Sequence, residues 1–382
     1  MTATVKRRMV WFDANRVCAA GAVVMIHSTT DFSGGVFPKA AVADRIVPVI
    51  LRSLGEFSGS EMFFFFSLFL MASRLDRRPT TYFKVLGDQA GRLLVPFSFW
   101  VVFYAFFRLV KASAFGYQPH IWEQLTQWQS WLGYFVLGNV QYHLHFLPTL
   151  FLIFLFYPVM KLGTRYPILG LSVFATLAVM QSVQGYFWQI DIDPLLRQYL
   201  LRAAKVMGYV GYGFAAFAMF GIWKDGIPRG ESKLIRKGAL FFAAIAYMAT
   251  IPFYGTALLS GSWGVRDGWS FFGHFLMPLF MFALFMGGQH EDWSPRWSRF
   301  AKYTFGIYLV HPLVIDIFDV LMVGWGPALA PWQLVAARFA VVLPSSVLVA
   351  IGLSRLTATA WTIGLGPAPW NWGRKSAEVV GA

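Results

Sequence analysis

The sequence predicts an all-α integral membrane protein, a polytopic bundle of about ten transmembrane helices that forms one domain over residues 1–382. Hydrophobic residues make up 57% of the chain and charged residues only 13%, about half the share that soluble domains carry. Apolar runs of about 20 residues, long enough to cross a bilayer, follow one another from end to end. The runs do not alternate apolar and polar residues as barrel strands do, so they predict helices.

A spanning helix is expected at each of ten apolar runs, at residues 9–28, 57–73, 91–111, 145–162, 166–184, 206–223, 237–257, 270–288, 301–322 and 332–356. Basic residues gather in the loops that this count places on one side, at positions 6–8, 74–84, 161–165, 224–237, 296–302 and 374–375. The opposite loops, 29–56, 112–144, 185–205, 258–269 and 323–331, hold fewer. Basic loops mark the cytoplasmic side, so we expect a protein of the cell (inner) membrane with both termini in the cytoplasm.

The net charge of +14 is also compatible with a nucleic-acid-binding protein. Short basic clusters between apolar runs are more typical of the positive-inside bias than of a phosphate-binding face, so no nucleic-acid partner is expected. The single cysteine, Cys18, excludes a disulfide framework and a thiolate metal cluster. His274 and His290 are too scattered to indicate a metal site, and we expect none.

The first apolar run carries Asp13, Arg16 and His27. Charged residues inside a membrane usually face a protein interior or a wet cavity. Arg16 and His27 are eleven residues apart, so at about 100° per residue they project from one face of a helix, ~16 Å apart along its axis. Asp13 precedes Arg16 by three residues, within reach of an ion pair. The pattern fits either a buried ion pair beside a core histidine or a functional face.

Other polar residues occur inside or next to the later apolar runs: Glu56, Glu61, Arg92, His143, His145, His274, His311 and Asp316. They are too many for a passive bundle, and the acidic ones are too few for an obvious cation pathway. Gly211-x-Gly213 lies inside an apolar run, where helix packing explains it better than nucleotide binding. The chain contains no Gly-x-Ser-x-Gly motif, so a serine acyl-enzyme is unsupported.

Five segments are similar, in order, to motifs of one family: Asp13-x-x-Arg16 with His27, FFFFSLFLMASR (63–74), GRLLVPF (91–97), QYHLHFLPTLFL (141–152) and KYTFGIYLVHPLV (302–314). Through them the chain resembles the membrane O-acyltransferases of acyltransferase family 3 over nearly its full length. It departs from the family pattern at Leu68, where glycine is usual, and at His145, where tryptophan is usual.

The resemblance implies transfer of an acyl group from a coenzyme A thioester to a hydroxyl of a carbohydrate or another envelope molecule. The group is usually acetyl, with succinyl as the alternative. Acyl-coenzyme A is then a co-substrate and no cofactor is tightly bound. The expected partners are this donor, a free or lipid-linked carbohydrate and membrane lipids, while the acceptor's identity and the oligomeric state stay open. His27 and Arg16 match the family's essential positions.

These residue types suit that chemistry. A sugar hydroxyl is a poor nucleophile, and a neutral His27 can act as the general base that removes its proton. Asp13 is expected to pair with Arg16. Residues expected on the acceptor side are Tyr142, His143, His145, Glu61 and His311. His311 and Asp316 repeat a His-x4-Asp spacing known from other acyltransferases, but on a helix they point ~140° apart, so we treat that match as coincidental. His311 either lines the cleft or makes a structural hydrogen bond.

Arg16 and a group of basic residues are expected to hold the phosphates of coenzyme A at the inner surface. The others of this group are Arg77, Arg78, Lys84 and Arg92. For Arg77 and Arg78 the setting of topology explains the charge equally well.

Two other classes of function fit a bundle with intramembrane charges. One is a transporter or flippase for a lipid-linked glycan, and the other is a non-catalytic membrane scaffold or sensor. No matching halves are visible in the sequence, and a scaffold would leave the shared face of Arg16 and His27 without a purpose. Acyl transfer is therefore the leading hypothesis.

Overall fold

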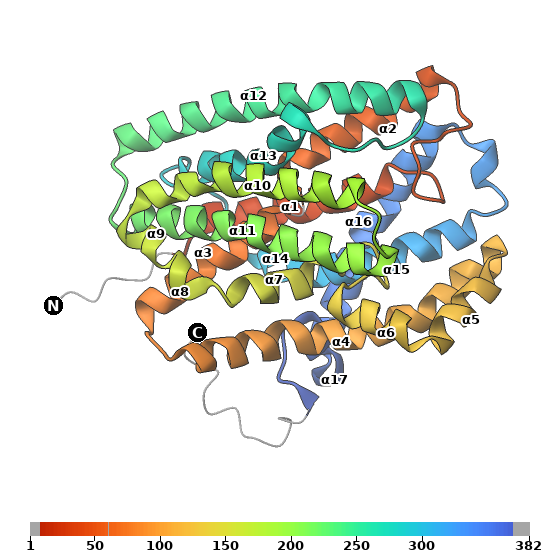
Figure 1. Cartoon of the computed structure of the whole chain (residues 1–382), viewed down its shortest axis with the longest axis horizontal. Helices are drawn as coiled ribbons and strands as arrows, with labels where there is room; N and C mark the ends of the chain where they lie inside the picture. The colour runs from red at the N-terminus through yellow and green to blue at the C-terminus, as the bar shows by residue number, and fades with distance from the viewer. Residues whose placement is uncertain (1–7, 60, 370–382) are drawn as a thin grey trace.

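Long helices run side by side in the computed structural model, which describes residues 8–59 and 61–369 (Figure 1). Within these residues the secondary structure is helical and no strand is found, so the predicted all-α fold is confirmed. The basic residues at positions 6–7 and 374–375 lie outside the described part of the chain.

The elements follow in this order: α1 (Val10–Ser28), α2 (Val42–Gly55), η1 (Glu56–Ser58), α3 (Glu61–Arg77), α4 (Tyr82–Phe115), α5 (Gln118–Thr126), α6 (Trp128–Val136), α7 (Phe146–Phe154), α8 (Tyr157–Met160), α9 (Leu162–Arg165), η2 (Pro167–Leu171), α10 (Ser172–Gln189), α11 (Pro194–Lys224), α12 (Arg229–Ser260), α13 (Gly268–Met286), α14 (Arg296–Ala301), α15 (Thr304–Leu321), η3 (Gly326–Ala328), α16 (Pro331–Arg355), α17 (Thr357–Ala360) and η4 (Trp361–Ile363).

Eight segments of the described chain are long and apolar enough to cross a membrane: Val42–Arg77, Tyr82–Phe115, Pro167–Gln189, Pro194–Lys224, Arg229–Ser260, Gly268–Met286, Thr304–Leu321 and Pro331–Arg355. The bent pair Phe146–Phe154 and Tyr157–Arg165, whose halves meet at 66°, would be a ninth. Helix α1 is not among the eight. Each of the ten predicted runs contains helix, while the count of ten spans and their orientation stay predictions.

The stretch 29–56 was expected to be a loop, and for its second half this expectation is wrong. It contains α2, which η1 connects to α3. The outward face of α2 is apolar, with Ile46 and Ile50 exposed, whereas Arg45 and Ser53 are buried on its inward face. Because α2 turns its polar residues inward, its average composition is too polar for the run to be recognised as a membrane segment.

Helices also extend further into the remaining loops than expected. Helix α4 reaches Phe115, and α5 and α6 form the stretch that follows it, at the right-hand end of Figure 1. Most of the stretch 185–205 is helical, because α10 continues to Gln189 and α11 begins at Pro194. The Asp193 carboxylate caps α11 by accepting a hydrogen bond from the Leu196 backbone N–H at 2.9 Å.

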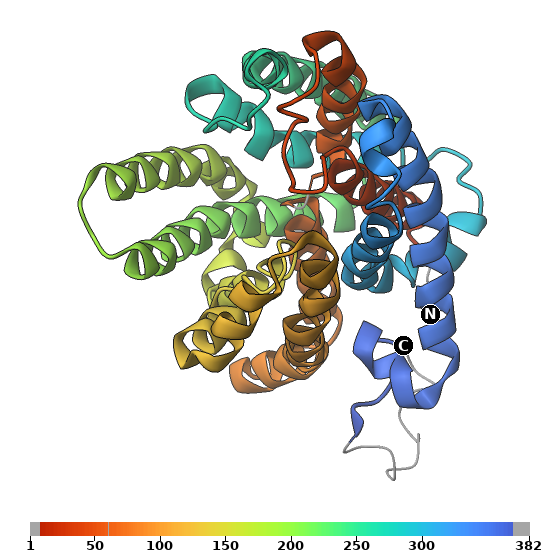
Figure 2. The same cartoon turned by 90° about the vertical axis from the view of Figure 1, so that its right-hand side faces the viewer.

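Helix α1 lies inside the bundle. It packs against α2, α14, α15 and α16, while α10 pairs with α11 and α12 pairs with α13 (Figure 2). Aromatic rings fill the core beside its first turns, and the ring centroids of Phe12 and Phe69 are 5.6 Å apart. Phe282 of α13 lies 5.0 Å from Phe69. A central α1 places both Arg16 and His27 within the protein.

Gly211 and Gly213 allow α11 to approach its neighbours closely. A Cβ atom at Gly211 would lie 2.0 Å from Thr176 Oγ1 and 2.7 Å from Val173 Cα, both on α10. A Cβ atom at Gly213 would lie 2.1 Å from Met160 Sδ. The Gly-x-Gly pattern therefore serves helix packing, as the sequence indicates.

Replacing Gly211 with valine is expected to destabilise the protein by roughly 1–3 kcal/mol, because the α10 backbone at Val173 must move. The control is Gly185→Val on α10, where a new Cβ atom would meet nothing within 4 Å. Thermal unfolding of both purified variants in one detergent measures the difference. Equal melting temperatures would show that the contact between α10 and α11 is not tight.

Candidate active site

A cavity with a volume of about 1230 Å³ lies at the end of the bundle where α4 meets α5. Its wall is built by the end of α1, the segment that follows it, and parts of α2, α4, α15 and α16. His27 is one of the wall residues. We call this space the large cavity. It is wide enough for a sugar residue, since small-molecule sites commonly measure about 300–1,000 Å³.

His27 occupies the last turn of α1 and is half-buried. Its ring centroid lies 4.4 Å from that of Tyr142, which also lines the large cavity, and 5.4 Å from that of His311. The His27 and His311 rings are stacked, with 25° between their planes. His27 therefore faces the cavity on one side and is supported by a second imidazole.

His311 and His143 lie behind His27 and are not among the described residues that line the large cavity. Their rings are 5.3 Å apart. His311 Nδ1 lies 3.2 Å from the Ile307 carbonyl oxygen, the structural hydrogen bond considered from sequence. Both ring nitrogens of His143 are buried, and neither forms a well-aligned hydrogen bond with any residue that the structure describes. Burial, more than the nearby imidazoles, lowers the pKa of His143 well below its usual range and keeps this side chain neutral at pH 7.

Two cations and two carboxylates form a buried network in the wall of the large cavity. Lys111 Nζ donates to Asp316 Oδ1 at 2.9 Å and to Asp319 Oδ2 at 2.7 Å. Arg338 Nη2 donates to Asp319 Oδ1 at 2.6 Å, and Gln141 donates to Asp316 Oδ2 at 3.0 Å. The charges of the four ionised groups cancel. Sequence reasoning missed Lys111, Asp319 and Arg338, although a single charge inside an apolar run is the signal that identifies such residues.

Arg338 is fully buried and also holds the end of α1. Its Nη1 group donates to the Ser28 carbonyl oxygen at 3.3 Å and to the Thr30 carbonyl oxygen. These are the residues that follow His27 in the chain. Arg338 therefore connects the ion network to the backbone that positions the imidazole.

Arg16 lies closer to the start of α1, away from the large cavity. Its Nη2 group donates to Thr304 Oγ1 at 3.0 Å. Its Nη1 atom lies 3.8 Å from Oδ1 of Asp13, the expected partner. Asp13 Oδ2 accepts shorter hydrogen bonds from Arg8 Nε, at 2.9 Å, and from the Ser298 hydroxyl, at 2.6 Å. Arg16 and His27 share a helix, but Arg16 is not one of the described residues that line the large cavity.

A comparison with protein-family models matches residues 9–355 to the family 3 acyltransferases, described as an acyltransferase domain. The chain belongs to acyltransferase family 3. It is therefore a membrane acyltransferase, as the five sequence motifs predicted. Comparisons with curated proteins and with solved structures gave no match.

The acyltransferase brings some of its expected donor-binding residues together. Arg92 of α4 is close enough to Arg16 to interact with it electrostatically, and Arg74 is similarly close to Arg92. Arg77 donates to the Ser73 carbonyl oxygen in its own helix at 3.0 Å. Lys84 is an exposed residue of α4. Arg78 follows the end of α3 directly.

Glu61 and His145, both expected on the acceptor side, are not among the described residues that line the large cavity. Glu61 Oε1 accepts a hydrogen bond from the Tyr209 hydroxyl at 3.2 Å and lies 3.8 Å from His274 Nε2. His274 Nδ1 is 2.7 Å from Glu56 Oε2, so a histidine lies between two carboxylates at the break between α2 and α3. The His145 carbonyl oxygen accepts from Arg202 at 2.7 Å.

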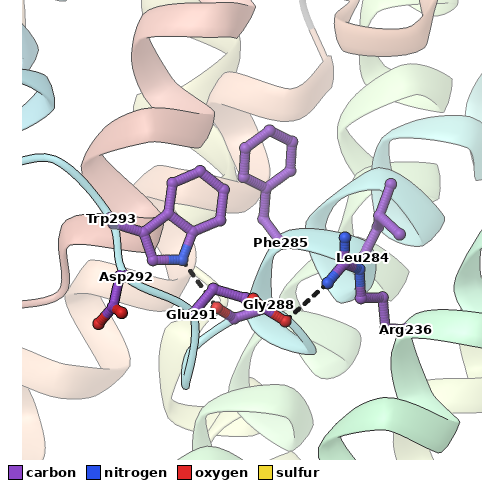
Figure 3. A pocket seen from close by; sticks show the side chains of 7 residues that line it. All are labelled: Arg236, Leu284, Phe285, Gly288, Glu291, Asp292 and Trp293. Carbon is purple, nitrogen blue, oxygen red and sulfur yellow. Dashed lines mark hydrogen bonds and ion pairs between the residues drawn. The ribbon is translucent and has the colours of Figure 1, made fainter.

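A smaller pocket of about 350 Å³ lies between the start of α12 and the end of α13 (Figure 3). Arg236 and Glu291 form an ion pair across it at 2.8 Å, and the Trp293 indole N–H donates to the Gly288 carbonyl oxygen at 2.7 Å. None of the residues expected in the site of the acyltransferase lines this pocket. The large cavity is therefore the candidate active site.

Proposed function

We propose that this acyltransferase transfers an acetyl group from acetyl-coenzyme A to a hydroxyl of a carbohydrate of the cell envelope or of an exported polysaccharide. The observation that carries the proposal is the His27 imidazole in the wall of the large cavity, in a chain of acyltransferase family 3. The cavity is large enough to hold a sugar residue, and the Tyr142 ring beside His27 offers an aromatic face on which a sugar can stack.

In this proposal the acceptor hydroxyl approaches His27 from the large cavity. The imidazole takes the hydroxyl proton while the oxygen attacks the thioester carbonyl carbon. The tetrahedral intermediate then collapses, the C–S bond breaks, and coenzyme A leaves as a thiolate that recovers the proton from the imidazolium.

The donor is proposed to reach the reacting atoms from the opposite end of the bundle. Arg16 and Arg92 lie close to one another on that side, and a guanidinium pair suits the phosphates of coenzyme A. Lys84, Arg77 and Arg78 add positive charge at the same end. The abundance of basic residues there supports a cytoplasmic donor side, cytoplasmic termini and a location in the inner membrane.

Mass analysis of envelope polysaccharides from cells with and without the protein tests this function. Acetylated species are expected only in cells that make the protein, and the size of the mass shift distinguishes acetyl from succinyl. Purified protein should also release coenzyme A from acetyl-coenzyme A when the acceptor is present. Unchanged polysaccharides, together with glycan movement into liposomes without thioester cleavage, would indicate a transporter and refute the proposal.

Arg16→Gln and Arg92→Gln are each expected to raise KM for acetyl-coenzyme A roughly 10- to 100-fold, because a hydrogen bond to a charged group contributes about 1.5–3 kcal/mol. The control is Arg165→Gln at the end of α9, whose guanidinium lies over the Tyr166 ring. Initial rates over a range of donor concentrations provide KM and kcat. A lower kcat with an unchanged KM would show that Arg16 does not bind the donor.

A further inference from the structure

The wall of the large cavity carries more positive than negative charge. Its cations are Lys39, Arg52, Arg108, Lys111 and Arg338, and its carboxylates are Asp31, Asp316 and Asp319. Lys111 and Arg338 neutralise Asp316 and Asp319. Among the residues that the structure describes, Arg52 and Arg108 form no ion pair with any carboxylate. The Glu56 carboxylate acts on Arg52 electrostatically, but its oxygens are paired with Arg266 and His274. Neither Arg52 nor Arg108 therefore has a directly paired carboxylate among the described residues.

The third carboxylate, Asp31, does not neutralise the charge of Arg52 or Arg108. Its Oδ1 atom accepts hydrogen bonds from the Ser33 backbone N–H at 2.9 Å, the Ser33 hydroxyl at 2.7 Å and the Gly35 backbone N–H at 2.7 Å. The carboxylate is therefore engaged in its own loop.

Arg52 of α2 lies beside His27. Its Nη1 group donates to the carbonyl oxygen of Ile26, the residue before His27, at 2.9 Å. Its guanidinium lies 4.3 Å from the ring centroid of Trp263, another residue of the cavity wall. Its Nε atom is buried and has no hydrogen-bond partner in the described part of the chain. Arg52 is therefore held in place next to the general base with donors still unused.

Arg108 of α4 likewise has a hydrogen-bond donor that is not used. Its Nη2 group donates to Gln124 Oε1 at 3.1 Å and to the Tyr134 hydroxyl at 2.6 Å. Its buried Nε atom has no hydrogen-bond partner among residues 8–59 and 61–369. A partly buried cation without a counter-ion is costly. A guanidinium matches the two oxygens of a carboxylate or phosphate geometrically, so an anion is the ligand that relieves this cost best.

We propose that the acceptor of this acyltransferase is an acidic carbohydrate, whose carboxylate or phosphate binds Arg52 while a neighbouring hydroxyl faces His27. Arg108 binds a second negative charge of the same acceptor chain. The Tyr142 and Trp263 rings hold the apolar faces of the sugar between the two charges. This inference rests on the proposed function and defines its acceptor class.

Competition in membrane vesicles that contain the full chain and its native acceptor tests the proposal. Labelled acetyl-coenzyme A reports transfer, and the competitors are glucuronate, glucose 6-phosphate and glucose. We expect the two anionic sugars to inhibit at concentrations at least tenfold lower than glucose. Whichever anion inhibits more strongly distinguishes a carboxylate from a phosphate on the acceptor.

Variants at Arg52 test whether this residue causes the stronger inhibition by anionic sugars. Arg52→Gln is expected to remove the preference for anionic competitors and Arg52→Lys to keep part of it. Arg197→Gln is the matched control, because Arg197 also lies over a tryptophan ring, at 5.4 Å, and bonds to backbone carbonyl oxygens, but does not line the large cavity. This control should retain the full preference.

Equal inhibition of the wild type by glucuronate and glucose would overturn the inference and leave the proposed function intact. So would an Arg52→Gln variant that transfers more slowly but keeps the preference, because Arg52 would then act on the reaction itself. A preference for succinyl- over acetyl-coenzyme A that depends on Arg52 would place the anion on the acyl group instead. Absence of any transfer in wild-type vesicles would refute the proposed function and this inference with it.

Discussion

His27→Gln is expected to lower kcat for acyl transfer by at least about 100-fold, since positioned general bases contribute typically 10²- to 10⁴-fold. Glutamine retains a similar shape and a hydrogen-bonding group but cannot accept the hydroxyl proton. The stacking of His27 on His311 shows that the ring also has packing neighbours, so expression and thermal stability must be measured beside activity. We expect the variant to insert into the membrane and bind acetyl-coenzyme A with an unchanged affinity.

His120→Gln is the matched control for this experiment. His120 lies on α5 at the same end of the bundle, is exposed, and contacts Gln124 at 3.0 Å. It should transfer acyl groups at the wild-type rate. A His27→Gln enzyme with kcat within a few-fold of wild type would eliminate His27 as the general base.

Arg338→Met is expected to lower both the stability of the protein and the rate of acyl transfer. Removing one partner of a buried ion pair typically costs about 3–5 kcal/mol, because the other charge stays buried. Here Asp319 loses Arg338 and keeps only Lys111, and the carbonyl groups of Ser28 and Thr30 lose their donor. We therefore expect a lower melting temperature together with slower acyl transfer.

The double variant Arg338→Met/Asp319→Asn separates the two roles of Arg338. It restores charge balance, since Lys111 and Asp316 remain paired. Stability should recover by more than half, whereas kcat should stay low because the Ser28 and Thr30 carbonyl groups beside His27 still lack the donor that Arg338 provides. Recovery of kcat in parallel with stability would show that Arg338 has a structural role only.

The sequence predicts features that depend on local periodicity. Arg16 and His27 do lie on one helix, α1, because their spacing and the apolar residues between them define that helix without any knowledge of its neighbours. The small residues Gly211 and Gly213 are likewise understood from their place in an apolar run. In both cases the residue types and their place in one apolar run indicate the role, although the neighbouring helices are known only from the structure.

The parts that could not be predicted depend on contacts between distant segments. The rings of His27, His143 and His311 come from three separate regions of the chain and meet only in the folded protein. Lys111 and Asp319 are more than two hundred residues apart in a single ion pair. Helix α2 was not predicted because its polar residues face the protein interior and its apolar residues face outward. In an amphipathic helix of a soluble protein the two faces are reversed.

The central claim is that the acceptor binds in the large cavity while the donor approaches from the opposite end of the bundle. Sealed, inside-out membrane vesicles test it most directly, because acetyl-coenzyme A does not cross membranes and its label can be followed. Donor added outside such vesicles, on the original cytoplasmic face, should label carbohydrate enclosed within them. Labelling only when carbohydrate and donor share one side of the membrane would contradict the claim.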